Sequence, residues 1–320
     1  MDIGRAIDTN ANWDTAPKLM DIIGVNSNSV IDCDIEYWIH NVAQGTLSGL
    51  VNGHKPRQIL EEHMTTDGPL RDSLIKEMAF RFKTESVATK GLCELTAIAP
   101  NTKYMEFFVT QVMDEARHAH IFKNHILELG IPKQALSQTI ELNASHDEKA
   151  ILAPMHEWAM GVIRDEGYFY GGVAIITILL EGVLAPAAAL SEIKWRPLNP
   201  MVADIEKGAN IDEVRHLNVG AQIIKDHLKN NPRDKGRLLK VITEGRAIWG
   251  ALPVSDMIYE RECLFQEGIS PLISTFRDYE LISGMPLSKT TPESRMELSF
   301  AWSHEMQLSR LKYMGLSEAI

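Results

Sequence analysis

The pattern Asp-Glu-x-Arg-His occurs twice in this chain of 320 residues, at positions 114–118 and 212–216. Two matches to four fixed residue types are far more than the amino-acid composition predicts by chance. On a helix, residues three positions apart lie on the same face. Each copy therefore presents one carboxylate and one imidazole in the same direction, which is half of a metal site.

A further glutamate precedes each repeat in a neighbouring helical segment. Glu85 lies upstream of the first repeat, and Glu181 is the single charged residue in the apolar stretch 168–190. An ionised carboxylate in such a stretch is costly without a partner. Antiparallel helices joined by a short turn bring such residues level with one another. We therefore predict a metal centre with six ligands, which are Glu85, Glu115, His118, Glu181, Glu213 and His216.

The six ligands indicate which metal the centre holds. Two helices that give one Glu each and two that give Glu-x-x-His each form the ligand pattern of di-iron and di-manganese carboxylate bundles. Four carboxylates and two neutral imidazoles balance the charge of two divalent ions, and these donors suit iron or manganese. Zinc would favour a tetrahedral site with fewer carboxylates. The predicted cofactor is two Fe ions, with Mn or a mixed Mn/Fe pair as alternatives.

The repeats also contain residues suited to hold the ligands in place. Asp114 and Asp212 directly precede a glutamate ligand, and Arg117 and Arg215 directly precede the histidines. A metal-bound imidazole usually donates its remaining N–H to a carboxylate. We predict that each Asp contacts the His of the other repeat and that the Arg residues pair with these Asp groups.

Residues one or two helical turns from the ligands are candidates for a substrate pocket. Most of them are apolar, which is usual for a site that binds a small molecule. Gln111 and Thr89 are equally suited to a packing role. The candidates are Thr89, Phe108, Gln111, Phe122, Thr177, Ala185 and Ala209.

The hydrophobic pattern is helical almost throughout, because i, i+3, i+4, i+7 spacing recurs in long blocks. We predict an all-α helix bundle in which residues 1–30 form a loosely ordered N-terminal arm. Residues 31–320 are predicted to form one helical domain, with the metal core at 70–229. The predicted helices span 31–51, 70–98, 101–129, 146–163, 165–192, 199–229, 233–266, 269–283 and 292–315.

Charge and cysteine content limit the partners and the location. The net charge is −11 and no run of Lys and Arg with interleaved aromatics occurs, so nucleic acid is not expected as a partner. Three scattered cysteines predict reduced thiols in a cytoplasmic protein. The stretch 168–190 is long enough to cross a membrane, but the centre of a bundle also requires a helix that is apolar all round. We predict a buried core helix and no membrane span.

At these repeats and upstream glutamates, the sequence resembles the ferritin-like di-iron carboxylate superfamily over residues 70–229. The paired E…DExRH motifs are most similar to its oxygen-activating branch, which includes bacterial multicomponent monooxygenase hydroxylases and arylamine N-oxygenases. The resemblance implies a ferritin-like four-helix bundle with additional helices and the six ligands above. It also implies a reduced di-iron centre that binds O₂ as co-substrate, and a homodimer.

Three positions differ from members of this superfamily. Ala209 stands where arylamine N-oxygenases carry an extra histidine, and Ala185 stands where monooxygenase hydroxylases have a threonine. Phe122 occupies the position of the radical tyrosine of ribonucleotide reductase small subunits. In size and overall pattern, the chain is similar to the di-iron enzymes of azoxy natural-product pathways, such as that of valanimycin.

The resemblance implies O₂-dependent oxidation of a small organic molecule. We predict N-oxidation of an amine or hydrazine to an N-oxygenated or azoxy product in specialised metabolism. The alternatives are a C–H monooxygenase with a separate reductase and a ribonucleotide-reductase-like subunit that generates a radical. The sequence contains no nucleotide-binding glycine fingerprint and no iron–sulfur cysteine set. Electrons are therefore predicted to come from an external reductase or from the substrate itself.

Overall fold

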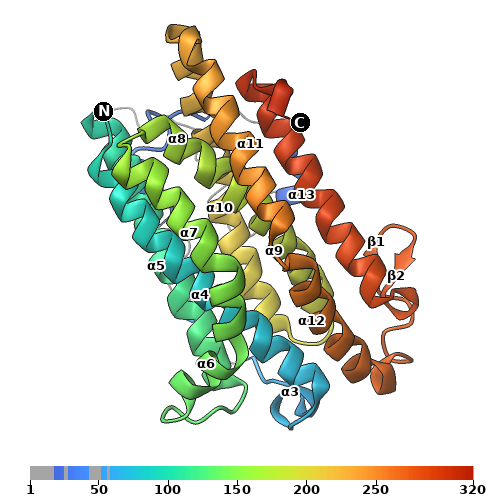
Figure 1. Ribbon diagram of the computed structural model, residues 1–320. Coiled ribbons are helices and arrows are strands. Elements are labelled where there is room, and N and C mark those ends of the chain that lie inside the picture. Colours follow the sequence, from blue (N-terminus) through green and yellow to red (C-terminus); the bar gives the residue numbers. More distant parts are fainter. Residues whose placement is uncertain (1–17, 25–27, 43–51, 56–57, 320) are drawn as a thin grey trace.

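The computed structural model describes residues 18–24, 28–42, 52–55 and 58–319, and this part of the chain is all-α apart from one small hairpin (Figure 1). Two long helices, α4 (Pro69–Ala97) and α5 (Thr102–Glu128), pack along each other. The longest helix, α10 (Pro200–Asn230), packs on α5 and on α9 (Glu181–Trp195).

The starts of α5 and α10 follow from local sequence. The side chain of Asn101 accepts a hydrogen bond from the Tyr104 N–H at 3.1 Å, and Asn199 accepts one from the Val202 N–H at 3.1 Å. Asparagine is a favoured cap because its oxygen pairs with an N–H that lacks a helical partner. Pro200 occupies the first position of α10, where its missing N–H costs nothing. These short connections place the neighbouring helices antiparallel.

The chain between α5 and α10 contains two π-interrupted helical stretches. The first begins at Leu136, whereas the sequence predicted a start at 146. The early turns of this helix are polar except for the buried Ile140 and Ala144, so the hydrophobic pattern did not reveal them. The second runs through Phe169–Trp195 and has the length and composition of a membrane span, yet 78% of its most apolar window is buried. It packs against α10 and α13, as a core helix does. The segments are α6 (Leu136–Asp147), π turn Glu148–Leu152, α7 (Ala153–Met160), π turn Gly161–Asp165, α8 (Phe169–Ala174), π turn Ile175–Leu180 and α9.

The C-terminal third differs from the sequence prediction at two places. The helix predicted over 233–266 is broken near Pro253, which lacks the N–H that a continuous helix needs. The helix predicted over 269–283 is wrong, because residues 270–278 form a 3₁₀ turn and other turns, and Glu280–Ile282 pairs with Met285–Pro286 in a hairpin that turns at Gly284, with φ of +79°. The elements are 3₁₀ turn Pro232–Asp234, α11 (Lys235–Ala251), α12 (Val254–Ile269), 3₁₀ turn Ser270–Leu272, β1 (Glu280–Ile282), β2 (Met285–Pro286), 3₁₀ turn Leu287–Lys289, α13 (Pro292–Met314) and 3₁₀ turn Ser317–Ala319.

The N-terminal region contains short elements. The helix predicted over 31–51 is described only to residue 42, and 43–51 lie outside the described residues. Of the predicted arm, residues 1–17 and 25–27 also lie outside them, and Leu19 is buried against α9 and α10. The elements are 3₁₀ turn Leu19–Ile22, α1 (Ile35–Tyr37), π turn Trp38–Val42 and α3 (Glu62–Thr65).

Two apolar clusters fill the bundle at different heights along its long helices. On α5, Phe108 belongs to one cluster and Phe122 to the other, and the first repeat lies between them. On α10, Ile223 and Val202 divide in the same way around the second repeat. The polar residues of both repeats are therefore enclosed by apolar layers above and below.

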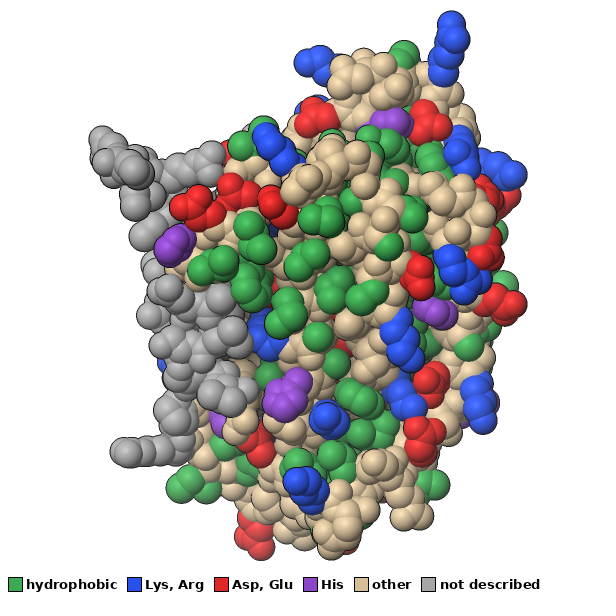
Figure 2. All heavy atoms as spheres, turned by 90° about the vertical axis from the view of Figure 1, so that its left-hand side faces the viewer, with side chains coloured by type: hydrophobic (Ala, Val, Ile, Leu, Met, Phe, Trp, Pro, Cys, Tyr) green, Lys and Arg blue, Asp and Glu red, His purple; other side chains and the backbone are tan. Residues whose placement is uncertain are grey.

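Figure 2 shows the side of the molecule on which α5 lies, with hydrophobic side chains scattered among charged ones. Lys and Arg are interspersed with Asp and Glu, and they form no continuous basic patch on this face.

Candidate metal centre

Both Asp-Glu-x-Arg-His repeats lie in the middle of long helices, the first on α5 and the second on α10. Helical spacing brings the Glu and His of each repeat to one face, with 3.2 Å from His118 Nδ1 to Glu115 Oε2. The corresponding distance from His216 Nδ1 to Glu213 Oε2 is 3.8 Å. Both imidazoles are fully buried. Each repeat therefore directs a ligand pair into the interior.

Glu181 follows directly after the π turn Ile175–Leu180. A π turn breaks the regular ladder of backbone hydrogen bonds, and such turns are frequent at functional sites. Side chains from other helices bond to its carbonyls: Gln307 donates to Ile178 O at 2.8 Å, and Trp249 donates to Leu179 O at 2.6 Å. The turn that aims Glu181 inward is thus supported by α11 and α13.

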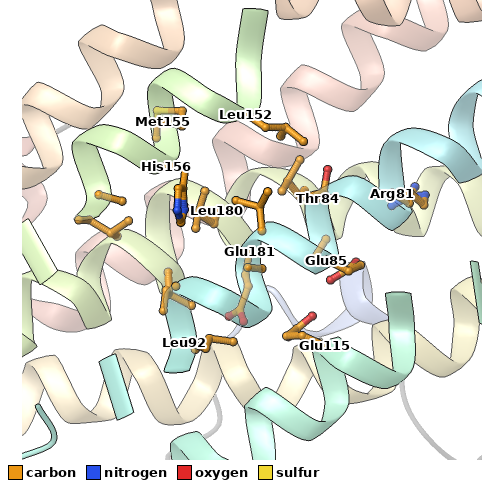
Figure 3. A pocket seen from close by; sticks show the side chains of 18 of the residues that line it. Arg81, Thr84, Glu85, Leu92, Glu115, Leu152, Met155, His156, Leu180 and Glu181 are labelled. Atoms are coloured by element: carbon orange, nitrogen blue, oxygen red, sulfur yellow. The ribbon is translucent and has the colours of Figure 1, made fainter. Parts of the chain in front are cut away.

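The six predicted ligands form two overlapping groups. In the first group, Glu115, Glu181, Glu213 and His216 each offer an atom, and these atoms lie within 4.8 Å of one another. Glu115 also belongs to the second group, with Glu85 and His118. Figure 3 shows Glu85, Glu115 and Glu181 close together, although they come from three different helices. The two groups therefore share one carboxylate, that of Glu115.

Several atoms in the first group lack hydrogen-bond partners within the described part of the chain. They are Oε1 of Glu115, Oε2 of Glu181, Oε2 of Glu213 and Nδ1 of His216, all buried, and the Glu115 oxygen and the His216 nitrogen lie 3.2 Å apart without the geometry of a hydrogen bond. Buried polar atoms almost always have a partner, so four exceptions at one place require an explanation. Three oxygens and one imidazole nitrogen are suitable donors for iron or manganese. The buried Glu and His side chains could therefore bind a metal ion.

The other nitrogen of each imidazole faces an aspartate. His118 Nε2 lies 3.2 Å from Asp212 Oδ2, and His216 Nε2 lies 3.2 Å from Asp114 Oδ2. Each Asp thus contacts the His of the other repeat, which is the arrangement the motif suggested. An imidazole that donates from Nε2 keeps the lone pair of Nδ1 free for a metal.

The two aspartates are paired with cations from the same repeats. Arg117 pairs with Asp212, and Arg215 pairs with Asp114. The indole N–H of Trp38 also donates to Asp114, at 3.0 Å to Oδ1. Trp38 could not be connected with the site from the sequence, because it lies 76 positions from Asp114 in a short element that shows no pattern linking it to the repeat. The arginines compensate the buried aspartates and leave the glutamates for the metal.

Burial and neighbouring charges shift the pKa values of these glutamates in different directions. Burial raises the pKa of Glu85 well above its usual range, and the charge of Glu115 raises it further. Burial and the charge of Glu213 raise the pKa of Glu181 to about 8. Burial acts on Glu115 as well, but the imidazoles of His118 and His216, each 3.2 Å from one of its oxygens, outweigh it and hold its pKa well below the usual range. Buried carboxylates perturbed in this way are typical of functional sites.

A cavity of about 90 Å³ adjoins this cluster (Figure 3). Its wall is mostly apolar, and all four glutamates of the cluster contribute to it. Three of the seven pocket candidates from the sequence line this cavity, which are Phe122, Ala185 and Ala209. The other four are not among its lining residues, and they are Thr89, Phe108, Gln111 and Thr177.

The four remaining candidates have packing or supporting contacts. Gln111 donates to the carboxylate of Glu181, and the Thr89 hydroxyl donates to the backbone oxygen of Glu85 at 2.7 Å. Phe108 is fully buried within an apolar cluster. Thr177 packs so closely against Gly220 that a Cβ there would lie 2.0 Å from its hydroxyl. Gln111 thus supports a ligand without lining the cavity.

The wall opposite the glutamates comes from α7 and the end of the π turn before it, which the sequence did not connect with the site. Leu152, Met155 and His156 line the cavity there (Figure 3). Burial lowers the pKa of His156, and the nearby Lys90 and Arg164 lower it further. A neutral imidazole is thus the single His in the cavity wall among the described residues. No spacing in the sequence connects α7 to the repeats, so only the tertiary packing reveals it.

No protein-family model and no curated protein matches the chain.

Proposed function

We propose that the protein is a ferritin-like, non-haem di-iron oxidase or oxygenase that uses O₂ to oxidise a small organic molecule. The observation that carries this proposal is the pair of ligand groups that share Glu115 beside a mostly apolar cavity. Zinc sites seldom gather four carboxylates, whereas di-iron and di-manganese sites use this set.

The helices that supply the ligands support the ferritin-like assignment. α4 and α9 each give one Glu, and α5 and α10 each give Glu-x-x-His. This division of ligands among four helices is that of di-iron carboxylate bundles. In this proposal α4, α5, α9 and α10 form the four-helix bundle, and α6, α7 and α11–α13 are the additional helices.

The chain's own residues would orient and shield the reaction. Bound iron would supply the redox chemistry for O₂, and manganese is the alternative metal. Asp114 and Asp212 hold the imidazoles in one orientation, and the apolar wall keeps bulk water away from the reacting groups. Electrons would come from an external reductase or from an easily oxidised substrate. A homodimer and a cytoplasmic location remain predictions.

Among the possible reactions, N-oxidation of an amine or hydrazine is our first choice, and C–H hydroxylation is the second. The mostly apolar cavity accommodates a small molecule for either reaction. A radical-generating subunit has less support, because Phe122 is buried in the cavity wall and carries no hydroxyl. The nitrogen preference comes from the sequence resemblance alone.

Metal analysis combined with O₂ exposure of the ferrous protein tests the proposal. We expect about two irons per chain and O₂ consumption in the full-length protein. The Glu213→Gln variant removes one carboxylate with little change in shape, so it should hold at most about half of the iron. Glu244→Gln, on the surface of α11 beside Lys240, is the matched control and should leave iron content unchanged. Binding of zinc alone, or equal iron in both variants, would refute the di-iron assignment.

A further inference from the structure

A second cavity, of about 100 Å³, adjoins the one at the metal centre. The two cavities share five lining residues, which are Arg81, Thr84, Glu85, Leu184 and Trp249. The second cavity extends from the predicted ligand Glu85 along α4 and is enclosed by residues of α9, α12 and α13. Nothing in the proposed oxidation accounts for this space.

The wall of the second cavity contains buried ion pairs. Lys194 Nζ lies 2.6 Å from Glu262 Oε1 and 3.6 Å from Glu77 Oε2. Arg295 Nε lies 2.5 Å from Glu262 Oε2. Glu77 and Glu262 are therefore already engaged by cations, and the third carboxylate of the wall, Glu85, belongs to the candidate metal cluster.

Arg81 adds a third cation and is also engaged. Its Nε lies 2.7 Å from Glu206, which is fully buried, and its second contact is with Glu77 at 3.4 Å. Burial raises the pKa of Glu206 to about 8, although the charge of Arg81 opposes this. Near neutral pH, Glu206 therefore carries a proton for much of the time and adds little negative charge.

Arg261 is the fourth cation, and no carboxylate lies within 4.0 Å of it among the described residues. Its guanidinium stands 5.3 Å from the centre of the Phe80 ring. Glu77, Glu262 and Asp147 attract it only from a distance, and Arg81 repels it. Four cations thus line or flank a space with three wall carboxylates. Glu77 and Glu262 are shared among the other three cations, and Glu85 belongs to the candidate metal cluster. A guanidinium in a cavity wall without its own carboxylate is suited to bind one from a ligand.

We propose that the second cavity binds the carboxylate of a small organic acid through Arg261. The substrate oxidised at the metal centre then carries this carboxylate, and this assignment of substrate class rests on the proposed function. The eight steps along α4 from Glu77 to Glu85 span about 12 Å at a rise of 1.5 Å per residue. A short aliphatic acid can extend over much of this length, with its charged end at Arg261 and its other end toward Glu85.

Calorimetric titration with two probes of similar shape tests the carboxylate site. Pentanoate carries the charge and pentanamide lacks it, so a surplus cation should favour pentanoate by at least about tenfold in Kd. The full-length protein is used as purified, and the metal content of every sample is measured. Equal affinity for the two probes, or binding of neither, would overturn the proposal without any variant.

Variants assign the site to Arg261. In Arg261→Gln the affinity for pentanoate should fall to that for pentanamide, and Arg261→Lys should retain part of the preference. Arg237→Gln is the matched control, because Arg237 pairs with Glu166 on the surface, away from both cavities, and it should bind pentanoate as the natural chain does. An unchanged Kd for pentanoate in a folded Arg261→Gln protein would contradict the assignment. The lysine variant keeps the charge and provides the test if the glutamine variant does not fold.

The binding assay and the iron assay test the two proposals separately. If pentanoate binds at Arg261 but the ferrous protein consumes no O₂, the oxidase proposal fails and the carboxylate site stands. If the iron and O₂ results are as expected but pentanoate has no advantage over pentanamide, only the substrate class is wrong.

Discussion

Asp212 Oδ2 lies 3.2 Å from Nε2 of His118, although 94 positions separate these residues in the chain. The reverse contact, from Asp114 to His216, has the same distance. The two repeats therefore support each other's ligands, and neither repeat could form its site alone. A contact that holds an imidazole in one tautomer acts on the metal without touching it.

Replacing Asp212 with Asn should weaken metal binding. The amide is a weaker acceptor for the His118 N–H, and its loss of charge leaves Arg117 unpaired in the interior. We expect iron affinity to fall by about 10- to 100-fold, the usual effect of removing such a support. Competition with a chelator measures it. Asp226→Asn, exposed on the same helix, is the control, and an equal loss there would argue against a specific role for Asp212.

Trp38 should contribute to stability through Asp114. In Trp38→Phe the ring is largely kept, but the hydrogen bond of 3.0 Å is lost. Asp114 keeps its contacts with Arg215 and His216. We therefore expect a loss of about 1–3 kcal/mol in the free energy of unfolding, as for a hydrogen bond to a charged group. Urea unfolding measures this loss. The control is Trp302→Phe, which shrinks the ring in the same way but removes no hydrogen bond of the described structure. The difference between the two variants therefore separates the effect of the hydrogen bond from that of ring size.

The candidate metal ligands of each repeat could be predicted from the sequence, because their spacing is local. Because His118 follows Glu115 by three positions, the two side chains share a helix face regardless of how the rest of the chain folds. Glu181 was accessible for a different reason, since a lone charge in an apolar helix requires a partner. Trp38, His156 and Arg261 could not be inferred, because their relation to the site depends on how distant helices pack.

The hairpin shows where helical spacing misleads. In the segment 269–283, Leu272, Phe276 and Tyr279 repeat at helical intervals and are partly buried, as a helix face would be. The following Gly284 and Pro286 favour a tight turn and an extended strand, and the chain pairs Glu280 with Pro286. The turn residues favour a hairpin here, and hydrophobic periodicity alone does not detect such turn residues.

Close packing between α10 and the π turn before Glu181 makes a second stability prediction. A Cβ on Gly220 would lie 2.0 Å from the hydroxyl oxygen of Thr177 and 3.2 Å from its Cβ. Gly220→Ala should therefore lose about 1–3 kcal/mol by overpacking, although alanine normally favours a helix by about 1 kcal/mol. Thermal unfolding measures this effect.

Two further variants check the contact with Thr177. Adding Thr177→Ala to Gly220→Ala removes the clashing hydroxyl and should restore much of the stability, a coupling that a double-mutant cycle reports. Gly236→Ala, on α11 with no atom within 4 Å of the new Cβ, should be neutral or slightly stabilising. Additive effects in the cycle would show that the two side chains do not meet.

The pH dependence of stability should reveal Glu128 at the end of α5. His54 Nε2 and His125 Nδ1 each lie 2.8 Å from its carboxylate oxygens. Burial alone would raise its pKa, but hydrogen bonds from the two histidines lower it from 4.5 to about 2. Because the pKa is lower in the folded state, this stabilisation is present above pH 4.5 and is lost as the pH falls toward 2.

Replacing Glu128 with Gln tests this sign. The natural chain should be more stable than Glu128→Gln above pH 4.5, and the difference in free energy of unfolding should shrink between pH 4.5 and 2. Urea unfolding at a series of pH values, with a chelator present, measures that difference. Glu297→Gln, exposed on α13, should show a small difference that stays flat with pH. If the difference in free energy of unfolding between the natural chain and Glu128→Gln were equally independent of pH, the histidines would not hold this carboxylate ionised.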